Sequence, residues 1–119
     1  MAAATAMPHD RGEVVKLLAK RLDPDQKDKE RYAVVLSERA YNDSHDHGVF
    51  VMIATNPPFG PAMGIYDIAD IKAAGLDHPS FVVPWLWTLK WTKVIRSTGE
   101  LPQDEFQQMI ERLREVVSI

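Results

Sequence analysis

Apolar and polar residues alternate in blocks along this chain, and the clearest blocks lie between residues 31 and 55. Two apolar runs, RYAVVLS (31–37) and VFVMIAT (49–55), flank a stretch rich in Asn, Asp, Ser, His and Gly. Runs of β-branched and aliphatic residues on either side of a polar turn predict a β-hairpin. We therefore expect two adjacent antiparallel strands here, with the turn centred on Asp43.

The register of this hairpin follows from the constant index sum of antiparallel partners, which places Ser37 opposite Val49 and Arg31 opposite Thr55. A guanidinium and a hydroxyl would then lie on the same side of the sheet at its open end. Such a pair is suited to binding a phosphate. The simpler alternatives are that Arg31 is a surface charge at the start of a strand and that Thr55 is only a good strand residue.

Outside the hairpin, short apolar runs predict further strands. These runs are residues 13–20 (EVVKLLAK), the beginning of 65–75 (IYDIADIKAAG), residues 80–86 (SFVVPWL), in which Pro84 breaks the strand, and residues 92–98 (TKVIRST). The segment 65–75 is expected to begin as an edge strand and to end in a short helical turn. Gly75 then occupies a cap or turn position.

Two loops are predicted beside the open end of the hairpin. Residues 21–30 are polar and contain a proline, and residues 56–64 contain three prolines and two glycines, too many for a regular element. The first loop leads directly to Arg31 and the second begins just after Thr55. Loops therefore flank the proposed phosphate site on both sides.

The C-terminal segment predicts an amphipathic helix over residues 102–118. Its apolar residues follow the i, i+3, i+4, i+7 spacing of one helical face, namely Phe106, Met109, Ile110, Leu113, Val116 and Val117. Pro102 in the first turn and the acidic Asp104 and Glu105 just after it are typical of a helix start. We interpret this helix as core scaffolding.

These elements predict a mainly β fold with α: a small curved antiparallel sheet, close to an SH3-like barrel, with a long C-terminal helix. The 119 residues suffice for one domain. We expect residues 1–8 to be a disordered tail and residues 9–119 to form that domain. The absence of cysteine excludes disulfides and Cys-ligated zinc and suits a cytoplasmic protein. No apolar run is long enough for a membrane span, and the N-terminal residues lack the pattern of a signal peptide.

The net charge of −3 excludes a globally basic nucleic-acid-binding domain, so RNA binding would need a local patch. One segment, from His78 to Gly99, contains no Asp or Glu. It combines basic residues with tryptophans: Lys90, Lys93 and Arg96 with Trp85, Trp87 and Trp91. Cations that hold phosphates and indoles that stack on bases are typical of single-strand binders. The alternative is that these tryptophans belong to the core or to a homodimer interface. Three tryptophans in one short stretch are more large aromatic surface than a core of 119 residues readily absorbs, so we also expect a homodimer that covers the excess.

Histidines are the usual acid–base residues near neutral pH. His45 and His47 lie in the predicted turn, at the far end of both strands from Arg31, and His9 lies at the wrong end of the first strand. The H-x-H pair in an exposed turn is interpreted as solvated and not as a metal site. His78 remains as a candidate, because it precedes a strand in the segment free of acidic residues.

Five segments in this order resemble the MazF/PemK toxins of type II toxin–antitoxin systems: RGEVVKL (11–17), RYAVVLSERAYN (31–42), VFVMIAT (49–55), AAGLDHPSFVV (73–83) and the terminal helix. In that family the first strand opens with R-G-[DE]-[IV]-V, the second with R-P-[AV]-[LV]-V-[LV]-S, and the middle element carries A-G-L-x-x-P-S. The resemblance covers nearly the whole chain after residue 10. It implies an SH3-like fold and a sequence-specific endoribonuclease that cuts single-stranded RNA without a metal and is neutralised by a cognate antitoxin.

Metal-free cleavage of RNA uses the ribose 2′-OH as the nucleophile, which requires a proton acceptor, positive charge at the phosphorane and an acid for the leaving oxygen. Arg31 is expected to supply the charge and Thr55 a hydrogen bond to a phosphate oxygen. The resemblance carries the family's catalytic Arg and Thr onto the same pair. RNA contacts are expected from Lys29, Asn56, His78, Lys90, Lys93 and Arg96. No cofactor or metal is expected.

The chain departs from the family pattern at two places. Tyr32 follows Arg31 where the family has Pro, and after FVVP the sequence WLWTLKWTK replaces a run of basic and polar residues. The alternative function is therefore a catalytically impaired member of the same fold that binds protein or RNA. A third possibility is a purely structural or dimerisation module, supported only by the tryptophans.

Overall fold

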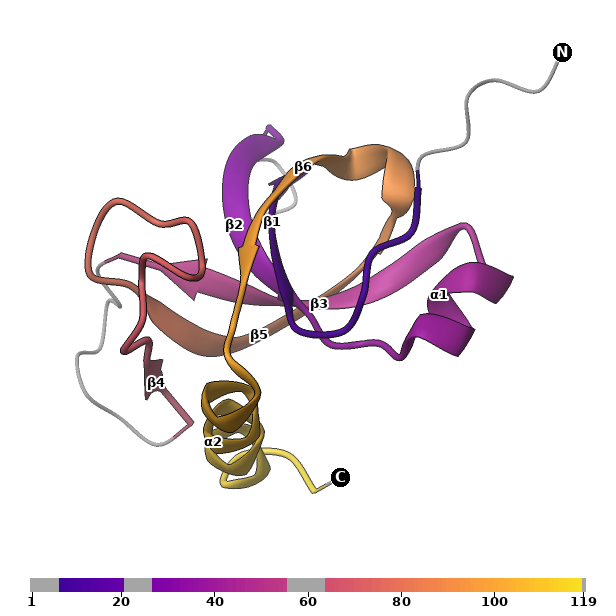
Figure 1. Cartoon of the computed structure of the whole chain (residues 1–119). Helices are drawn as coiled ribbons and strands as arrows, with labels where there is room; N and C mark the ends of the chain where they lie inside the picture. The colour runs from indigo at the N-terminus through magenta and orange to yellow at the C-terminus, as the bar shows by residue number, and fades with distance from the viewer. Residues whose placement is uncertain (1–6, 21–26, 56–63, 119) are drawn as a thin grey trace, which may run out of the picture.

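The computed structural model describes residues 7–20, 27–55 and 64–118. Within these ranges six strands form one antiparallel sheet, in the order β4-β5-β3-β2-β1-β6. The strands are β1 (Glu13–Ala19), β2 (Lys29–Val35), β3 (His47–Ala54), β4 (Tyr66–Asp67), β5 (Phe81–Lys90) and β6 (Val94–Glu100); the helices are α1 (Arg39–Ser44), the 3₁₀ turn η1 (Trp91–Lys93) and α2 (Gln103–Arg114). The expected mainly β fold with a C-terminal helix is confirmed (Figure 1). In the described part of the chain, no helix has the length and apolar character needed to cross a membrane.

The sheet is strongly curved. Figure 1 shows the chain turning from β5 through η1 into β6, so that strands at opposite sides of the sheet order are joined across one end. Every second residue of the central strands points into the concave side. The cluster on this inner face consists of Val15, Leu17, Ala19, Ala33, Val35, Phe50 and Trp91. Burial of these side chains, at about 25 cal/mol per Å² of apolar surface, favours the curled arrangement over a flat sheet.

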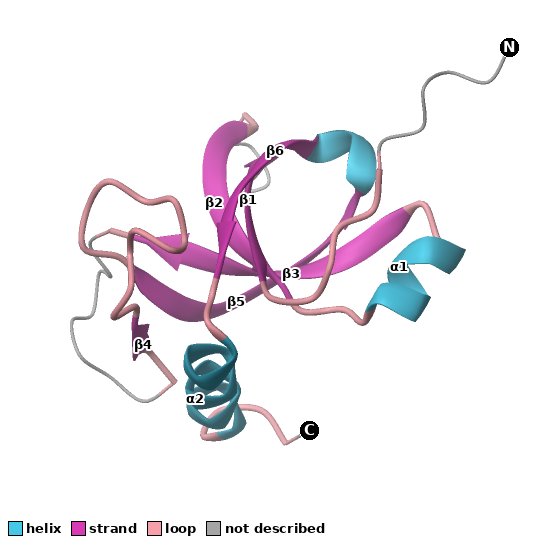
Figure 2. Ribbon diagram, in the orientation of Figure 1, coloured by secondary structure: helices cyan, strands magenta, loops and turns pink. Residues whose placement is uncertain are grey.

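The alternate residues of the same strands form the second face, which α2 covers (Figure 2). Here Val14, Val34 and Val51 pack in one cluster with the helix residues Phe106, Met109, Ile110 and Leu113. These four helix residues were predicted to be buried, and that prediction is confirmed. The prediction is wrong for Val116 and Val117, which are 50% and 38% exposed, because the helix ends at Arg114.

Glu105, expected only as an acidic residue of the first helical turn, is a buried tether between α2 and the segment after β4. Its carboxylate accepts hydrogen bonds from the Tyr66 hydroxyl at 2.5 Å and from the backbone N–H groups of Ala69 and Asp70 at 2.7 and 3.0 Å. Burial, and then the bond to this carboxylate, raise the pKa of Tyr66. These bonds satisfy the charge and fix the helix against the sheet.

The β2–β3 hairpin is confirmed, but its predicted register is wrong by one residue. The observed partners are Tyr32 with Ile53 and Val35 with Phe50. The same index sum places Arg31 beside Ala54, and Thr55 lies one residue beyond β3. The connection is not the simple turn assumed from composition, because it contains α1 and therefore does not centre the pairing on Asp43.

Two strand boundaries also differ from the predictions. Pro84 does not break β5, because it lies in a register shift where β5 contains more residues than β3 between the pairs Leu86–Val51 and Val82–Ile53. Proline lacks an N–H and is tolerated at such a bulge. β2 begins at Lys29, two residues inside the predicted loop. Residues 21–26 and 56–63 of the two loops, and the tail residues 1–6, lie outside the described residues.

The edge strand and turn predicted for 65–75 are present: β4 is at the edge of the sheet, and Gly75 has a φ of 71°. A Cβ at Gly75 would lie 1.9 Å from the Thr98 carbonyl oxygen. Glycine is required here both by the positive φ and by the close approach of β6.

Candidate active site

The start of β2 and the end of β3 form the wall of a cavity of about 270 Å³. It is lined by Glu30, Arg31, Tyr32, Met52, Ile53, Ala54 and Thr55. Both residues expected to bind phosphate therefore lie on one cavity, although the register that led to the expectation is shifted by one. Arg31 and Thr55 lie close together because the start of β2 and the end of β3 are adjacent at the open end of the hairpin. They are not direct cross-strand partners.

Arg31 is held from one side only. Its Nε donates a hydrogen bond to the Ala19 carbonyl oxygen at 3.1 Å, across the β1–β2 pair. Among the described residues, no side chain or carbonyl group pairs with its terminal guanidinium nitrogens. A guanidinium anchored through Nε keeps these donors available for an anion such as a phosphate. Thr55 is exposed and offers a hydroxyl on the same cavity.

Glu30 is a cavity residue that the sequence analysis missed. Its carboxylate lies 2.9 Å from Lys16 Nζ, which in turn lies 5.8 Å from the centre of the Tyr32 ring. The hydrogen bond with Glu30 raises the pKa of Lys16. Neighbouring strand residues normally face opposite sides of a sheet, so nothing in the pattern placed Glu30 and Arg31 together. The only signal was its position next to Arg31.

Three of the predicted RNA contacts lie at the same end of the sheet as Arg31. Lys29 is exposed and paired in register with Ala19, and Arg96 is exposed on β6 opposite Lys16. Lys93 lies in η1, and its Nζ forms an ion pair of 2.8 Å with Asp28, which precedes β2. This bond lowers the pKa of Asp28.

The other predicted contacts are distributed differently. Lys90 pairs in register with His47 at the opposite end of the sheet, and its Nζ is 4.0 Å from Asp46. His78 is exposed in the turn that leads into β5, and its carbonyl accepts a bond of 2.8 Å from the Ser80 hydroxyl. Asn56 lies outside the described residues. The structure thus separates Lys90 from the cavity.

The three tryptophans have distinct environments. Trp91 is only 3% exposed and packs against Phe50 and Gly48, so it belongs to the core and is unavailable for stacking on bases. Trp85 and Trp87 are half-buried against the cluster of Met52, Ile65 and Val83. The interpretation of tryptophans as core residues is therefore right for Trp91 and partly right for the other two.

The histidines of the α1–β3 connection form a group of their own, distant from the cavity. Tyr41 stacks on His45 with ring centres 4.0 Å apart, and its hydroxyl lies 2.5 Å from His47 Nε2. His47 Nδ1 lies 3.0 Å from Asp46. His47 is the first residue of β3 and not part of a turn, but its location far from Arg31 is as expected.

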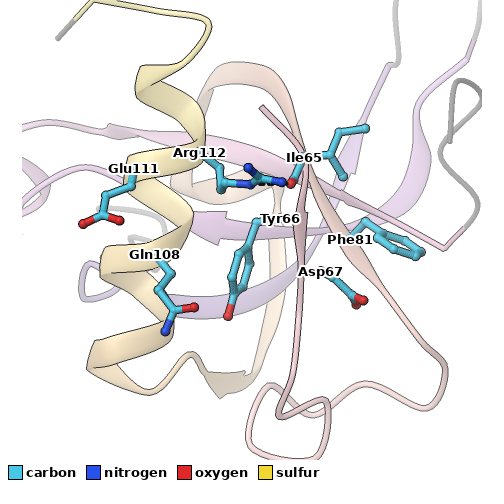
Figure 3. A pocket seen from close by; sticks show the side chains of 7 residues that line it. All are labelled: Ile65, Tyr66, Asp67, Phe81, Gln108, Glu111 and Arg112. Carbon is cyan, nitrogen blue, oxygen red and sulfur yellow. Dashed lines mark hydrogen bonds between the residues drawn. The ribbon is translucent and has the colours of Figure 1, made fainter. Parts of the chain in front are cut away.

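A second cavity, of about 430 Å³, lies between α2 and the edge strand β4 (Figure 3). Its lining includes the carboxylates of Asp67 and Glu111. The guanidinium of Arg112 donates to the Ile65 carbonyl oxygen at 3.1 Å and pairs with Glu115 at 3.1 Å. With its one cation already paired among the described residues, this cavity is electrostatically unsuited to a polyanion, which favours the cavity at Arg31 as the phosphate site.

Comparisons with known proteins agree on the fold. MazF from Deinococcus radiodurans superposes with a TM-score of 0.74 at 18% identity, covering 94% of this chain and 98% of that chain. An endoribonuclease in complex with its cognate antitoxin from Mycobacterial species gives 0.68 at 15%, covering 89% and 91%. A MazE–MazF complex from Deinococcus radiodurans gives 0.67 at 20%, covering 89% and 92%. No curated protein sequence gives a significant match.

A sequence profile of one family matches almost the whole chain. The match covers residues 10–117 and is described as the PemK-like, MazF-like toxin of type II toxin–antitoxin systems. It includes all of the described strands and helices and both sides of the cavity. This chain therefore belongs to the PemK-like, MazF-like toxin family.

Proposed function

We propose that this protein is an endoribonuclease toxin that cleaves single-stranded RNA, acts in the cytoplasm and is neutralised by a cognate antitoxin. The observation that carries the proposal is the cavity shared by Arg31 and Thr55, in which an anchored guanidinium keeps its terminal nitrogens unpaired among the described residues. Family membership and the likeness to an endoribonuclease bound to its antitoxin support it.

In this proposal the scissile phosphate binds between Arg31 and Thr55. The ribose 2′-oxygen forms a bond to phosphorus, and the bond from phosphorus to the 5′-oxygen breaks. The 5′-oxygen takes a proton from water, so the products are a 2′,3′-cyclic phosphate and a free 5′-hydroxyl. Arg31 stabilises the negative charge that develops on the phosphorane oxygens, the role that a metal ion plays in other nucleases. Thr55 donates a hydrogen bond to a non-bridging oxygen.

We assign the 2′-proton to the carboxylate of Glu30, which lines the same cavity. Lys16 Nζ lies 2.9 Å from that carboxylate and holds it at the edge of the cavity. Arginine is a poor proton acceptor because its pKa exceeds about 12. The nucleotides that flank the scissile phosphate are expected to lie over Lys29 and Arg96, whose exposed side chains are at this end of the sheet.

The experiment is RNA cleavage by purified protein in EDTA, on a long single-stranded transcript, beside Arg31→Ala and Thr55→Ala. Discrete cuts that end in 2′,3′-cyclic phosphate and are lost in both variants support metal-independent, sequence-specific cleavage at this cavity. A folded wild type that leaves RNA intact contradicts it. That outcome would favour the alternative of a protein- or RNA-binding module. The departure of residues 84–93 from the family pattern would then explain the loss of catalysis.

Two assembly states belong to the same proposal. An antitoxin is expected to bind as an extended segment that folds on contact with the toxin. A homodimer is expected as well. Trp91 is buried within the chain, so less aromatic surface is available for a dimer interface than the sequence suggested. Leu86 and Ile95 are 46% and 47% exposed and remain as apolar surface for such an interface. Sedimentation that shows a monomer at high micromolar concentration would contradict the dimer.

A further inference from the structure

The segment 84–93, in which this chain departs from its family's pattern, contacts the end of the sheet that carries Arg31. The indole Nε1 of Trp87, on β5, donates a hydrogen bond of 3.0 Å to the carbonyl oxygen of Lys20, just after β1. The ammonium group of Lys93, in η1, pairs at 2.8 Å with Asp28, just before β2. The segment 84–93 therefore contacts the chain both just after β1, at Lys20, and just before β2, at Asp28.

The hydrogen bond between Trp87 and Lys20 lies next to the hydrogen bond that holds Arg31. Arg31 Nε donates to the carbonyl oxygen of Ala19, and Trp87 Nε1 donates to the next carbonyl along the chain, that of Lys20. Trp87 also packs against the cluster that contains Met52, and Met52 lines the cavity. The position of the Ala19 carbonyl, and with it that of the guanidinium, is therefore tied to β5.

The ion pair between Lys93 and Asp28 holds the start of β2. Asp28 lies three residues before Arg31, and its carboxylate is held by Lys93. Arginine has four rotatable side-chain bonds, so a single hydrogen bond at Nε orients it only if both strands keep their relative position at this end. A displacement of about 1 Å at a reacting group can lower a rate about 100-fold.

We propose that Trp87 and Lys93 are positioning residues that fix the β1–β2 end so that Arg31 presents its terminal nitrogens to the scissile phosphate. The effect on cleavage rests on the proposed ribonuclease function; the effect on the Arg31 side chain does not. In this assignment Lys93 acts through Asp28 and not through a direct contact with RNA. The replaced segment 84–93 thus supports the catalytic arginine instead of signalling its loss.

The first test measures Arg31 without any RNA. In ¹⁵N NMR spectra of the full chain, Trp87→Phe is expected to shift the Arg31 Nε–H signal and to raise its exchange rate with water several-fold. The matched control is Trp91→Phe, since Trp91 Nε1 is buried with no hydrogen-bond partner among the described residues. An unchanged Arg31 signal in Trp87→Phe, or an equal change in both variants, would overturn the proposal.

The second test measures cleavage. Trp87→Phe is expected to lower kcat about tenfold with KM nearly unchanged, since ground-state contacts with RNA remain while the geometry of the reacting group is lost. Lys93→Met is expected to lower kcat about threefold, with recovery in Lys93→Arg. Arg39→Met, which removes ion pairs to Asp10 and Asp43 at the opposite end of the sheet, serves as the charge control.

Each outcome of the second test has a defined meaning. A rise in KM at constant kcat for Lys93→Met would overturn the positioning role in favour of a direct RNA contact. Loss of activity that is equal in Lys93→Met and Arg39→Met would overturn it in favour of a general effect of charge. If the wild type cleaves no RNA, the proposed function fails, and the same NMR measurement on Trp87→Phe and Lys93→Met still decides whether each residue positions Arg31: an unchanged Arg31 Nε–H signal overturns the role of that residue.

Discussion

At the end of the β2–β3 pair where α1 lies, polar side chains bond to one another, whereas at the other end they face a cavity. Buried Asn42, 1% exposed, donates to the His9 carbonyl oxygen at 2.7 Å and to the Ser37 carbonyl oxygen at 3.0 Å, and accepts from the Ser37 hydroxyl at 2.6 Å. That hydroxyl oxygen also accepts from the Val49 N–H at 2.9 Å. The buried polar groups of this Asn42–Ser37 network at the closed end therefore find their partners within the protein.

The open end differs because its strongest donor is bound at one atom only. Arg31 uses Nε for Ala19, and within the described residues its other nitrogens have no partner. Polar residues of the same hairpin therefore divide into two kinds. Those with complete internal bonding stabilise the fold, and those with incomplete bonding are available for a ligand.

The largest expected effect is a loss of RNA cleavage when Arg31, at the open end, is replaced. Arg31→Lys keeps the charge but loses the Nε anchor and the forked donors, so we expect cleavage to fall by about 100- to 1,000-fold. Thermal unfolding should stay close to that of the wild type, because the side chain is half-buried and bonded at one atom. Cleavage assays and calorimetry on the same preparations check both points. A large loss of stability would show that Arg31 is structural.

At the closed end the expected effect is on stability. Asn42→Ala leaves the groups at Ser37 and His9 without their partner, and we expect the free energy of unfolding to fall by about 2–4 kcal/mol. Cleavage per folded molecule should be unchanged. Urea denaturation measures the first and active-site titration the second. A loss of less than about 1 kcal/mol would mean that water replaces the Asn42 amide without penalty.

A smaller loss of stability is expected from Gly48→Ala. A Cβ at this position would lie 2.5 Å from the Trp91 ring, which cannot move far in the packed core. Overpacking of this kind costs about 1–3 kcal/mol. The double variant Gly48→Ala with Trp91→Phe should recover part of the loss, and denaturation of the three variants tests whether the clash with the indole is the cause.

The smallest expected effect concerns the pH dependence of the open end. The hydrogen bond from Lys93 lowers the pKa of Asp28 below its ordinary value of 3.8. The pair therefore contributes stability above pH 3.8, and this contribution is lost as the pH falls through the folded-state pKa. In Lys93→Met the pKa of Asp28 should rise toward 3.8, which a carboxyl ¹³C titration by NMR detects. An unchanged titration would mean that the ion pair is not formed in solution.

Much of the fold was predictable because period-2 and period-3.6 patterns act locally. Val14 and Val15 in β1 face opposite clusters, as alternation requires, and Phe106, Met109 and Ile110 form the buried stripe of α2. The failures have physical causes. The hairpin register depended on a connection that folds as α1, and the strand through Pro84 depended on a bulge that composition does not reveal.

For the site, the sequence was enough to place Arg31 near the start of one strand and Thr55 near the end of its neighbour, because chain order and strand alternation are local properties. The folded chain, and not any local pattern, places Glu30 on their cavity and bonds Trp87 to Lys20, 67 residues away. Contacts of this kind arise when a curved sheet brings together strands that are not neighbours in the sheet order. The curvature results from the packing of side chains on both faces at once, which a linear pattern does not encode.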